Sequence, residues 1–167
     1  CLLVKDGALV KTIGFKDPKY VGDPINAVRI FNEKAVDELM VLDIDATVLG
    51  KEPDYGMIEE LAGECRMPFC YGGGVSTVDQ ALKISKLGVE KVALSASVLL
   101  KPELVGEISA AIGSQSVVVV IDFKKSLFGS YDAYIRNGSK KIKKNVLELV
   151  SELESYGAGE LVLNSIE

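Results

Sequence analysis

Three consecutive glycines and the segments on either side of them are the part of this sequence best suited to bind a ligand. Residues 72–74 are all glycine; they follow the apolar segment 69–71 and precede apolar residues at helical spacing from Thr77. Glycine lets the backbone approach an anion closely, and the first N–H groups of a helix are free to bind one. We therefore expect a phosphate site here, with Ser76 capping the helix; a tight turn without a ligand is the alternative.

The sequence has no histidine, which limits the chemistry of any active site. Without histidine there is no Ser-His nucleophile pair, and Asp, Glu, Lys, Tyr or Cys must carry protons. The three cysteines, Cys1, Cys65 and Cys70, lack metal-ligand spacing and are expected to be reduced, mostly buried thiols. We expect neither a metal nor a cofactor.

Composition excludes several classes of protein. The 167 residues are 48% hydrophobic and 26% charged, enough for one substantial core. No run of 18 apolar residues predicts a membrane span, and no basic region followed by an apolar segment predicts a secretory signal. The net charge of -5 argues against nucleic acid as a partner. We expect a cytoplasmic protein that binds neither membranes nor nucleic acids.

Apolar segments alternate with helical patterns along the chain. Strands are expected at residues 1–4, 39–42, 69–71, 92–94, 117–121 and 161–163, with helices at 24–34, from 54, 77–87, 102–112 and 146–156. Asp6-Gly7 signals a hairpin turn, residues 11–22 are interpreted as a loop, and residues 125–144 as a polar hairpin. Strands and helices that alternate in this way predict an α/β fold with a parallel sheet and right-handed crossovers.

Internal similarity favours a closed barrel over an open sheet. Residues 38–43 resemble residues 160–165, and residues 1–5 can be aligned with residues 120–124. This is the spacing of a (β/α)8 TIM barrel built from two four-stranded halves, which needs about 250 residues. We therefore expect residues 1–167 to form one partial barrel domain with strands 1 to 6. Strands 7 and 8 would be absent, and strands 1 and 6 would be exposed edges.

Polar and glycine residues follow the expected strands, and in a barrel the carboxyl ends of the strands form the active site. Carboxylates together with glycine and serine loops fit acid–base chemistry on a phosphorylated substrate; for a single residue such as Asp45, a helix cap is the simpler explanation. The residues at these ends are Lys5, Asp43, Asp45, Gly72, Gly73, Gly74, Ser95, Ala96, Ser97, Asp122, Lys124, Asn164, Ser165 and Glu167.

Charged residues stand at the starts of the even-numbered strands, at the opposite end of the barrel. They are Glu38, Glu90, Lys91 and Glu160. Ordinary surface solvation is one explanation. The other is a ring of opposite charges around the barrel mouth, where a partner protein docks or a small molecule enters.

Several stretches together resemble the cyclase subunit of the imidazole glycerol phosphate synthase family. They are residues 4–7, 10–11, 22–24, 37–44, 72–74, 113–122 and 157–160, in order along the whole chain. The resemblance implies a TIM barrel that receives ammonia from a glutaminase subunit on its amino-terminal face and uses it on a phosphorylated substrate.

The resemblance also assigns roles to residues. It implies that Asp122 is one of two catalytic aspartates, that Lys11 lies on a mobile loop after strand 1, and that Gly74, Ser95 and Ala96 bind phosphate. It implies further that three of the four residues of the ammonia gate are Glu38, Lys91 and Glu160. The second catalytic aspartate of the family falls at position 3, where this chain has Leu3; leucine neither carries charge nor transfers a proton.

Three readings of function remain open. Residues 18–32 are most similar to a paralogous branch that serves amidino-sugar formation in surface polysaccharide pathways, with its own glutaminase and a sugar amidotransferase. Leu3 favours this branch slightly over a true histidine-pathway cyclase. The third reading is an inactive fragment or scaffold module, consistent with the expected exposed edge strands.

Overall fold

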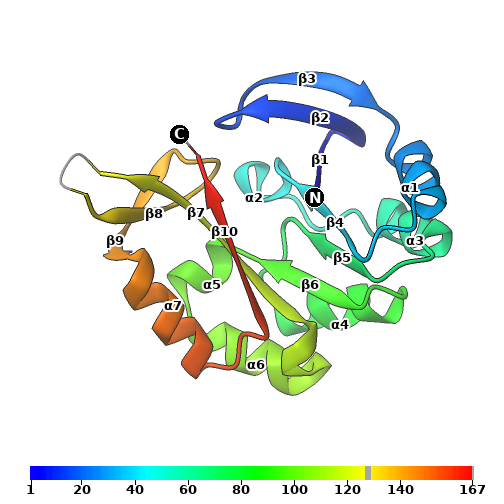
Figure 1. Cartoon of the computed structure of the whole chain (residues 1–167). Coiled ribbons are helices and arrows are strands. Elements are labelled where there is room, and N and C mark those ends of the chain that lie inside the picture. The colour runs from blue at the N-terminus through cyan, green and yellow to red at the C-terminus, as the bar shows by residue number, and fades with distance from the viewer. Residues whose placement is uncertain (127–128, 167) are drawn as a thin grey trace.

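Six parallel strands form the centre of the molecule in the computed structural model, which describes residues 1–126 and 129–166. They neighbour one another in chain order, and every neighbouring pair among them is parallel, which confirms the predicted sheet. The strands are β1 (Leu2–Lys5), β4 (Leu39–Asp43), β5 (Phe69–Gly72), β6 (Lys91–Leu94), β7 (Val117–Lys125) and β10 (Glu160–Ser165). The sheet curves from β1 at one end to β10 at the other (Figure 1).

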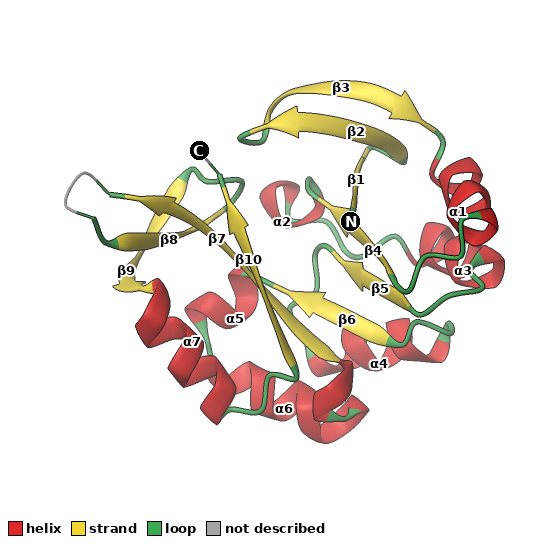
Figure 2. Cartoon of the chain, in the orientation of Figure 1, coloured by secondary structure: helices red, strands yellow, loops and turns green. Residues whose placement is uncertain are grey.

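Helices cover the outer side of this curved sheet, so the fold is α/β and has the form of a partial TIM barrel (Figure 2). The long helices are α1 (Pro24–Glu33), α3 (Tyr55–Glu64), α4 (Val78–Lys86), α6 (Glu103–Ile112) and α7 (Val146–Ser155). Two short helices, α2 (Ala46–Leu49) and α5 (Ala96–Leu100), follow β4 and β6, and a 3₁₀ turn, η1 (Ser114–Ser116), precedes β7. The sequence did not predict α2 or α5, because one turn is too short to show a helical period.

Alternate residues of each strand divide into two layers, since successive side chains point to opposite faces of a sheet. In β7, Val117, Val119 and Ile121 pack in the main core beneath the helices. Val118 and Val120 lie in a separate inner cluster. The whole inner cluster consists of Cys70, Ala93, Val118 and Val120, with Met40, Leu42 and Val162 packed against it.

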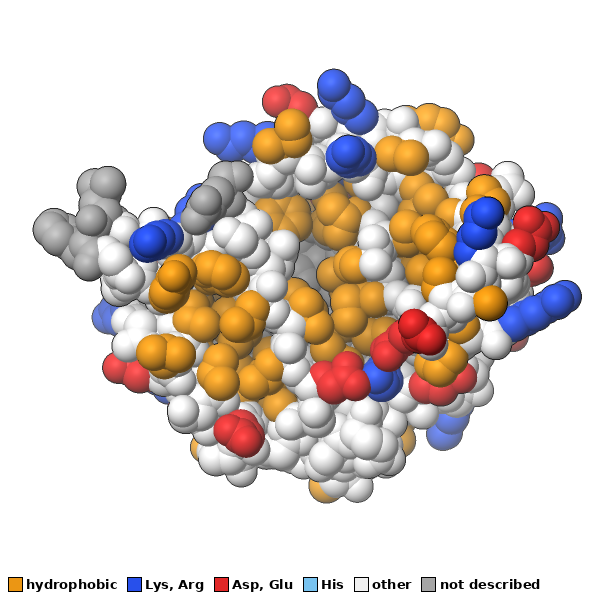
Figure 3. All heavy atoms as spheres, in the orientation of Figure 1, with side chains coloured by type: hydrophobic (Ala, Val, Ile, Leu, Met, Phe, Trp, Pro, Cys, Tyr) orange, Lys and Arg blue, Asp and Glu red, His pale blue; other side chains and the backbone are white. Residues whose placement is uncertain are grey.

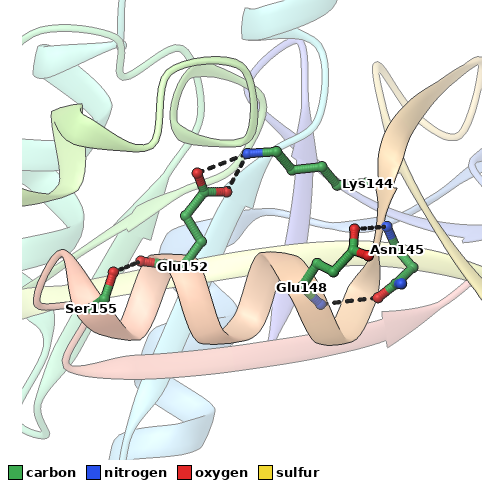
Figure 4. Close-up of polar contacts among 5 residues, drawn as sticks. All are labelled: Lys144, Asn145, Glu148, Glu152 and Ser155. Atoms are coloured by element: carbon green, nitrogen blue, oxygen red, sulfur yellow. Dashed lines mark hydrogen bonds and ion pairs between the residues drawn. The ribbon is translucent and has the colours of Figure 1, made fainter.

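Capping side chains fix where the helices begin. Asp23 and Asp54 accept hydrogen bonds from the first turns of α1 and α3. The cap of α4 is Thr77 and not the predicted Ser76. The Thr77 hydroxyl accepts the Gln80 N–H at 3.2 Å, and the Gln80 side-chain oxygen accepts the Thr77 N–H at 3.1 Å. Asn145 and Glu148 make the same reciprocal pair at the start of α7 (Figure 4).

A hairpin replaces the loop that was predicted at residues 11–22. After the Asp6-Gly7 turn, β2 (Ala8–Ile13) pairs antiparallel with β1, and β3 (Lys16–Gly22) pairs with β2. The prediction failed because β3 is exposed and rich in lysine and turn residues, so it shows no apolar alternation. Because β1 pairs with both β2 and β4, it is not the exposed edge that we expected.

The polar hairpin predicted at residues 125–144 is confirmed within the described residues. It consists of the end of β7, then β8 (Tyr131–Ile135) and β9 (Lys140–Asn145), all antiparallel; residues 127 and 128 lie outside the described part, as does the predicted strand-end residue Glu167.

None of the described helices is long and apolar enough to cross a membrane. Of the cysteines, Cys70 is buried and Cys65 half-buried, but Cys1 is exposed, contrary to the expectation of mostly buried thiols.

Candidate functional site

A cavity of about 640 Å³ lies at the carboxyl ends of the parallel strands. The structure brings most of the predicted strand-end residues together around it, and Leu3 lines it as well. The predicted residues on its wall are Asp43, Gly72, Gly73, Gly74, Ser95, Ala96, Ser97, Asp122, Asn164 and Ser165. The cavity thus combines carboxylates, a glycine run and the start of a short helix in one place.

Asp122 is the most buried acid of the cavity, with 8% of its surface exposed. Burial raises the pKa of its carboxyl, because the charged form loses its water; a hydrogen bond from Asn164 opposes this rise. The bond runs from Asn164 Nδ2 to Asp122 Oδ1 over 2.7 Å, between residues directly paired on β10 and β7. An acid in this setting is suited to exchange a proton with a bound ligand.

Each glycine of the run 72–74 occupies a place that a larger residue would not fit. A Cβ on Gly72 would lie 2.7 Å from Leu42 Cδ2, and one on Gly73 would lie 2.6 Å from Asp43 Cβ. A Cβ on Gly74 would lie 2.7 Å from the Lys51 carbonyl oxygen. Gly73 and Gly74 also have positive φ angles of 133° and 73°. The run therefore lets β5 pass close to the ends of β4 and α2.

Three backbone N–H groups around the start of α4, those of Ser76, Thr77 and Gln80, donate to side chains of the protein itself. The Gln80 side-chain oxygen accepts the backbone N–H groups of Ser76 and Thr77 at 2.7 and 3.1 Å. The start of α5 differs, because Ser95 makes no side-chain hydrogen bond to that helix. Next to the glycine run, the Gly74 N–H donates to the Thr47 hydroxyl at 3.4 Å and the Ser97 hydroxyl donates to the Val75 carbonyl at 2.8 Å, so side chains of α2 and α5 hold this loop in place.

Asp43 and Asp45, at the end of β4, are engaged with the protein itself. Asp43 Oδ1 accepts the backbone N–H groups of Asp45 and Ala46 at 3.0 and 3.1 Å. Burial raises the pKa of Asp43 and these two bonds lower it, burial being the larger effect. Asp45 forms an ion pair with Lys5 at 3.5 Å. These contacts shape the turn into α2, while the other face of Asp43 lines the cavity.

Lys11 lies in β2 and not on a loop. Its side chain is exposed and its paired residue is Lys19 of β3. Thr12, Gly14 and Phe15, which follow it, line the cavity, whereas Lys11 does not in this structure.

The predicted charged residues at the opposite end of the sheet form a three-residue cluster. Lys91 Nζ donates to Glu38 Oε2 at 2.9 Å and to Glu160 Oε1. The hydrogen bonds to Glu160 and then Glu38 raise the pKa of Lys91, so the ammonium is favoured. The two hydrogen bonds join the starts of β4, β6 and β10, although Glu38 and Glu160 lie 53 and 69 positions from Lys91 in the sequence. We call these three residues the charged cluster.

Glu90 does not belong to this cluster. Its carboxylate accepts the backbone N–H of Phe69 at 2.8 Å, and its own N–H donates to the Phe69 carbonyl at 3.1 Å. The observed contacts of Glu90 thus join the starts of β5 and β6.

The apolar inner cluster extends from the charged cluster to the cavity, whose wall includes Ala93, Val120 and Val162. Cys70 on β5 pairs in register with Lys91, and Gly72, two residues further along, pairs with Ala93. Val162 on β10 likewise lies between Glu160 and Asn164 on the inner face. Figure 3 shows apolar side chains gathered around a hollow on the face of the molecule that is turned toward the viewer in Figure 1.

Sequence reasoning missed two cavity residues at the tip of the β8–β9 hairpin, Arg136 and Asn137. The hairpin itself was predicted, but no residue of it was singled out. The available signal was Asn137-Gly138 between two strand segments, a strong turn dipeptide.

Within the described residues, no group of three His, Cys, Asp or Glu side chains is arranged to hold a metal ion.

Comparison with known proteins relates the whole chain to one family. The family described as "Histidine biosynthesis protein" matches residues 1–167. A protein of Vibrio vulnificus named "Putative imidazole glycerol phosphate synthase subunit hisF3" is 54% identical over 99% of this chain and 64% of its own length. A Pseudomonas aeruginosa protein named "Putative imidazole glycerol phosphate synthase subunit hisF2" is also 54% identical, over the whole chain and 66% of its own length.

A third relative carries the subunit name without a qualifier. The "Imidazole glycerol phosphate synthase subunit HisF" of Streptococcus sanguinis is 38% identical over the whole chain and 66% of its own length. The chain thus spans slightly less than two thirds of the length of these relatives.

Proposed function

The chain belongs to the histidine biosynthesis protein family, among the relatives of imidazole glycerol phosphate synthase subunit HisF, and on that basis we propose that it forms the ammonia-accepting, cyclase-type subunit of a glutamine amidotransferase complex. Its partner is a glutaminase subunit that docks on the amino-terminal end of the barrel, and its substrate is a phosphorylated small molecule. Residues 1–167 belong to a single barrel domain in this proposal.

The observation that carries the proposal is the arrangement along the inner face of the sheet. The charged cluster of Glu38, Lys91 and Glu160 stands at one end, and Asp122 stands in the cavity at the other. Between them lies the small, apolar inner cluster. Ammonia is small and uncharged, so it passes apolar side chains at far lower cost than an ammonium ion. The cluster acts as a charged gate, and Glu90 supports the docking face beside it.

The residues of the cavity divide the chemistry among them. Backbone N–H groups near Gly73, Gly74, Ser95 and Ala96 hold the substrate phosphate, helped by the open start of α5. Asp122 transfers a proton at the reacting centre, and Asn164 orients its carboxylate. Asp43 and Ser165 contribute to the wall of the substrate site. Lys11 acts only if the β2–β3 hairpin moves toward the cavity, since its side chain is exposed outside it.

Leu3 supports one branch of the family over the other. It lines the same cavity as Asp122, so a residue at position 3 meets the same ligand. Leucine at position 3 removes one of the two catalytic acids that ring closure uses in the family that the chain resembles. This favours a branch that delivers nitrogen for amidino-sugar formation in surface polysaccharide pathways, with a sugar amidotransferase as a further partner. The true histidine-pathway cyclase is the second candidate, supported by the names of the relatives.

The experiment uses the full-length protein and the histidine-pathway intermediate, with ammonia supplied directly. We expect no imidazole formation by the natural protein, and measurable formation by Leu3→Asp, with Leu3→Asn as the control that adds polarity without an acid. Ring closure by the natural protein would favour the histidine-pathway enzyme. A separate assay with the glutaminase partner tests the complex itself: if the protein neither binds the partner nor increases glutamine hydrolysis, it is a scaffold module or an inactive fragment.

A further inference from the structure

We propose that Arg136, at the tip of the β8–β9 hairpin, contacts the anionic group of the ligand, and that Asn137 is the positioning residue that keeps it over the cavity. This inference rests on the proposed function, because it assigns a specificity residue for the same phosphorylated substrate.

The charge balance of the cavity requires a cation. Its wall carries three carboxylates, from Asp43, Glu52 and Asp122, and two cationic side chains, from Lys51 and Arg136. Lys51 is already paired with Asp6 at 3.6 Å. Arg136 has no ion-pair partner among the residues that the structure describes. An anion that enters among three carboxylates is repelled unless a cation faces it, and among the described lining side chains Arg136 is the cation without an ion pair.

The hairpin tip is attached at a point far from its own strands. Asn137 Nδ2 donates to the carbonyl oxygen of Ile44 at 3.0 Å, directly after β4, while the hairpin extends from β7. In the order of the sheet, β5 and β6 lie between β4 and β7. The bond therefore ties the tip of the hairpin to the other side of the cavity mouth. Arg136 precedes Asn137 directly and shares this position.

Close packing against Ile166 restrains the position of the hairpin tip. A Cβ on Gly138 would lie 2.7 Å from Ile166 Cδ1, so the turn rests closely on the buried side chain that follows β10. At the base of the hairpin, Lys144 donates to Glu152 Oε1 of α7 at 2.7 Å (Figure 4). The hairpin is thus held at its base, at its tip and from below.

The backbone at the tip is strained where the arginine stands. Arg136 and Asn137 have φ angles of 52° and 55°, in the left-handed region. Asparagine tolerates this region and arginine is unusual there. Strained residues persist where their surroundings hold them, and they gather at ligand sites. An arginine retained here presents a planar fork of donors, which matches the oxygens of a phosphate or carboxylate.

The test is calorimetric titration of the full-length protein with ribose 5-phosphate, with ribose as the uncharged probe. We expect Arg136→Gln to weaken ribose 5-phosphate binding by about ten-fold or more, because a hydrogen bond to a charged group is lost. Arg136→Lys should fall between, since it keeps the charge and loses the fork. Arg66→Gln is the matched control: an exposed arginine before β5, outside the cavity, whose loss should leave the affinity unchanged.

Asn137→Gly separates positioning from folding, because glycine keeps the positive φ and removes only the amide that reaches Ile44. It should weaken ribose 5-phosphate binding when Arg136 is present and have little further effect in the Arg136→Gln background. Equal loss in both backgrounds would overturn the positioning role.

Unchanged affinity in Arg136→Gln, or no preference of the natural protein for ribose 5-phosphate over ribose, would overturn the role of Arg136. Either result leaves the proposed function standing if the complex still transfers nitrogen from glutamine. The proposed function fails separately, if that transfer is absent while Arg136 still controls anion affinity.

Discussion

Asn164 and Asp122 lie opposite each other on neighbouring parallel strands, and the Asn164 amide donates a 2.7 Å hydrogen bond to the Asp122 carboxylate. The pair places a fixed donor beside the most buried acid of the cavity. Burial raises the pKa of Asp122 and the donor restrains that rise, so the protonation of this acid depends on its neighbour.

Asp122→Asn should abolish turnover, whether the nitrogen comes from glutamine or from free ammonia. Removal of a general acid or base costs about 10²–10⁴-fold in rate. Rates measured with both nitrogen sources check this, and Asp132→Asn is a control outside the cavity. Full activity of Asp122→Asn would remove Asp122 from the proposed mechanism.

The same substitution should change stability with pH in a defined direction. Because the pKa of Asp122 is raised on folding, the folded chain binds more protons than the unfolded chain between the unfolded and folded pKa values. The contribution of this carboxyl to the free energy of unfolding is therefore present at low pH and is lost as the pH rises through that window. Asp122→Asn should raise the free energy of unfolding at pH 7, and the gain should shrink as the pH falls below the usual Asp range. Denaturant unfolding at several pH values measures it; a constant difference would contradict the assignment.

Gly73→Ala should destabilise the protein by about 2–4 kcal/mol, since it adds overpacking to a strained backbone. The new Cβ would lie 2.6 Å from Asp43 Cβ, at a φ of 133°. Gly63→Ala in α3 is the matched control: nothing lies within 4 Å of its Cβ, so it should stabilise the helix by about 0.5–1 kcal/mol. Unfolding in urea compares the two. Equal effects of the two substitutions on the free energy of unfolding would show that close contacts do not require glycine at position 73.

Much of the fold followed from the sequence because its signals were local. The apolar parallel strands and the starts of the helices near residues 24 and 54 were predicted, since each depends on periodicity or on a few adjacent residues. The exposed strand β3 was missed because solvated lysines give no apolar pattern.

The site was harder to predict than the sheet. Strand ends could be collected from sequence, and the structure places most of them around one cavity. The contact of Asn137 with Ile44 spans 93 positions and depends on how the hairpin folds back over the mouth, which no local pattern encodes. The contacts of the Gln80 side chain with the N–H groups of Ser76 and Thr77, just before α4, were missed because the sequence pattern indicated Ser76 as the cap, one position early.

Cys70 should report access to the inner face of the barrel. It is fully buried, pairs in register with Lys91, and burial raises the pKa of its thiol to about 12. The reactive thiolate is therefore scarce at pH 8. Under native conditions a maleimide should modify the exposed Cys1 quickly and Cys70 only after denaturation; mass spectrometry of the digested protein checks this. Rapid native labelling of Cys70 would show an open interior, in conflict with a dry apolar passage.

Lys91→Met should distinguish the role of the charged cluster from the role of the cavity, which lie at opposite ends of the proposed passage. The substitution keeps the length of the side chain and removes the cation between Glu38 and Glu160, at the end of the sheet opposite Asp122. Two unpaired carboxylates then repel each other and disturb docking or entry of ammonia. Glutamine-dependent turnover should fall several-fold, while turnover with free ammonia survives because the cavity is untouched. Steady-state rates of the full-length protein with its glutaminase measure both.

Lys101→Met is the control for this experiment, since Lys101 pairs with Glu107 on an exposed surface at 3.5 Å and should matter in neither assay. If Lys91→Met loses activity equally with both nitrogen sources, the cluster supports the fold and not the passage of ammonia. If Lys91→Met behaves like Lys101→Met, Lys91 is an ordinary surface lysine and the amino-terminal end has no part in transfer. Only a loss confined to glutamine-dependent turnover fits a charged gate, because that assay alone requires nitrogen to enter from the glutaminase side.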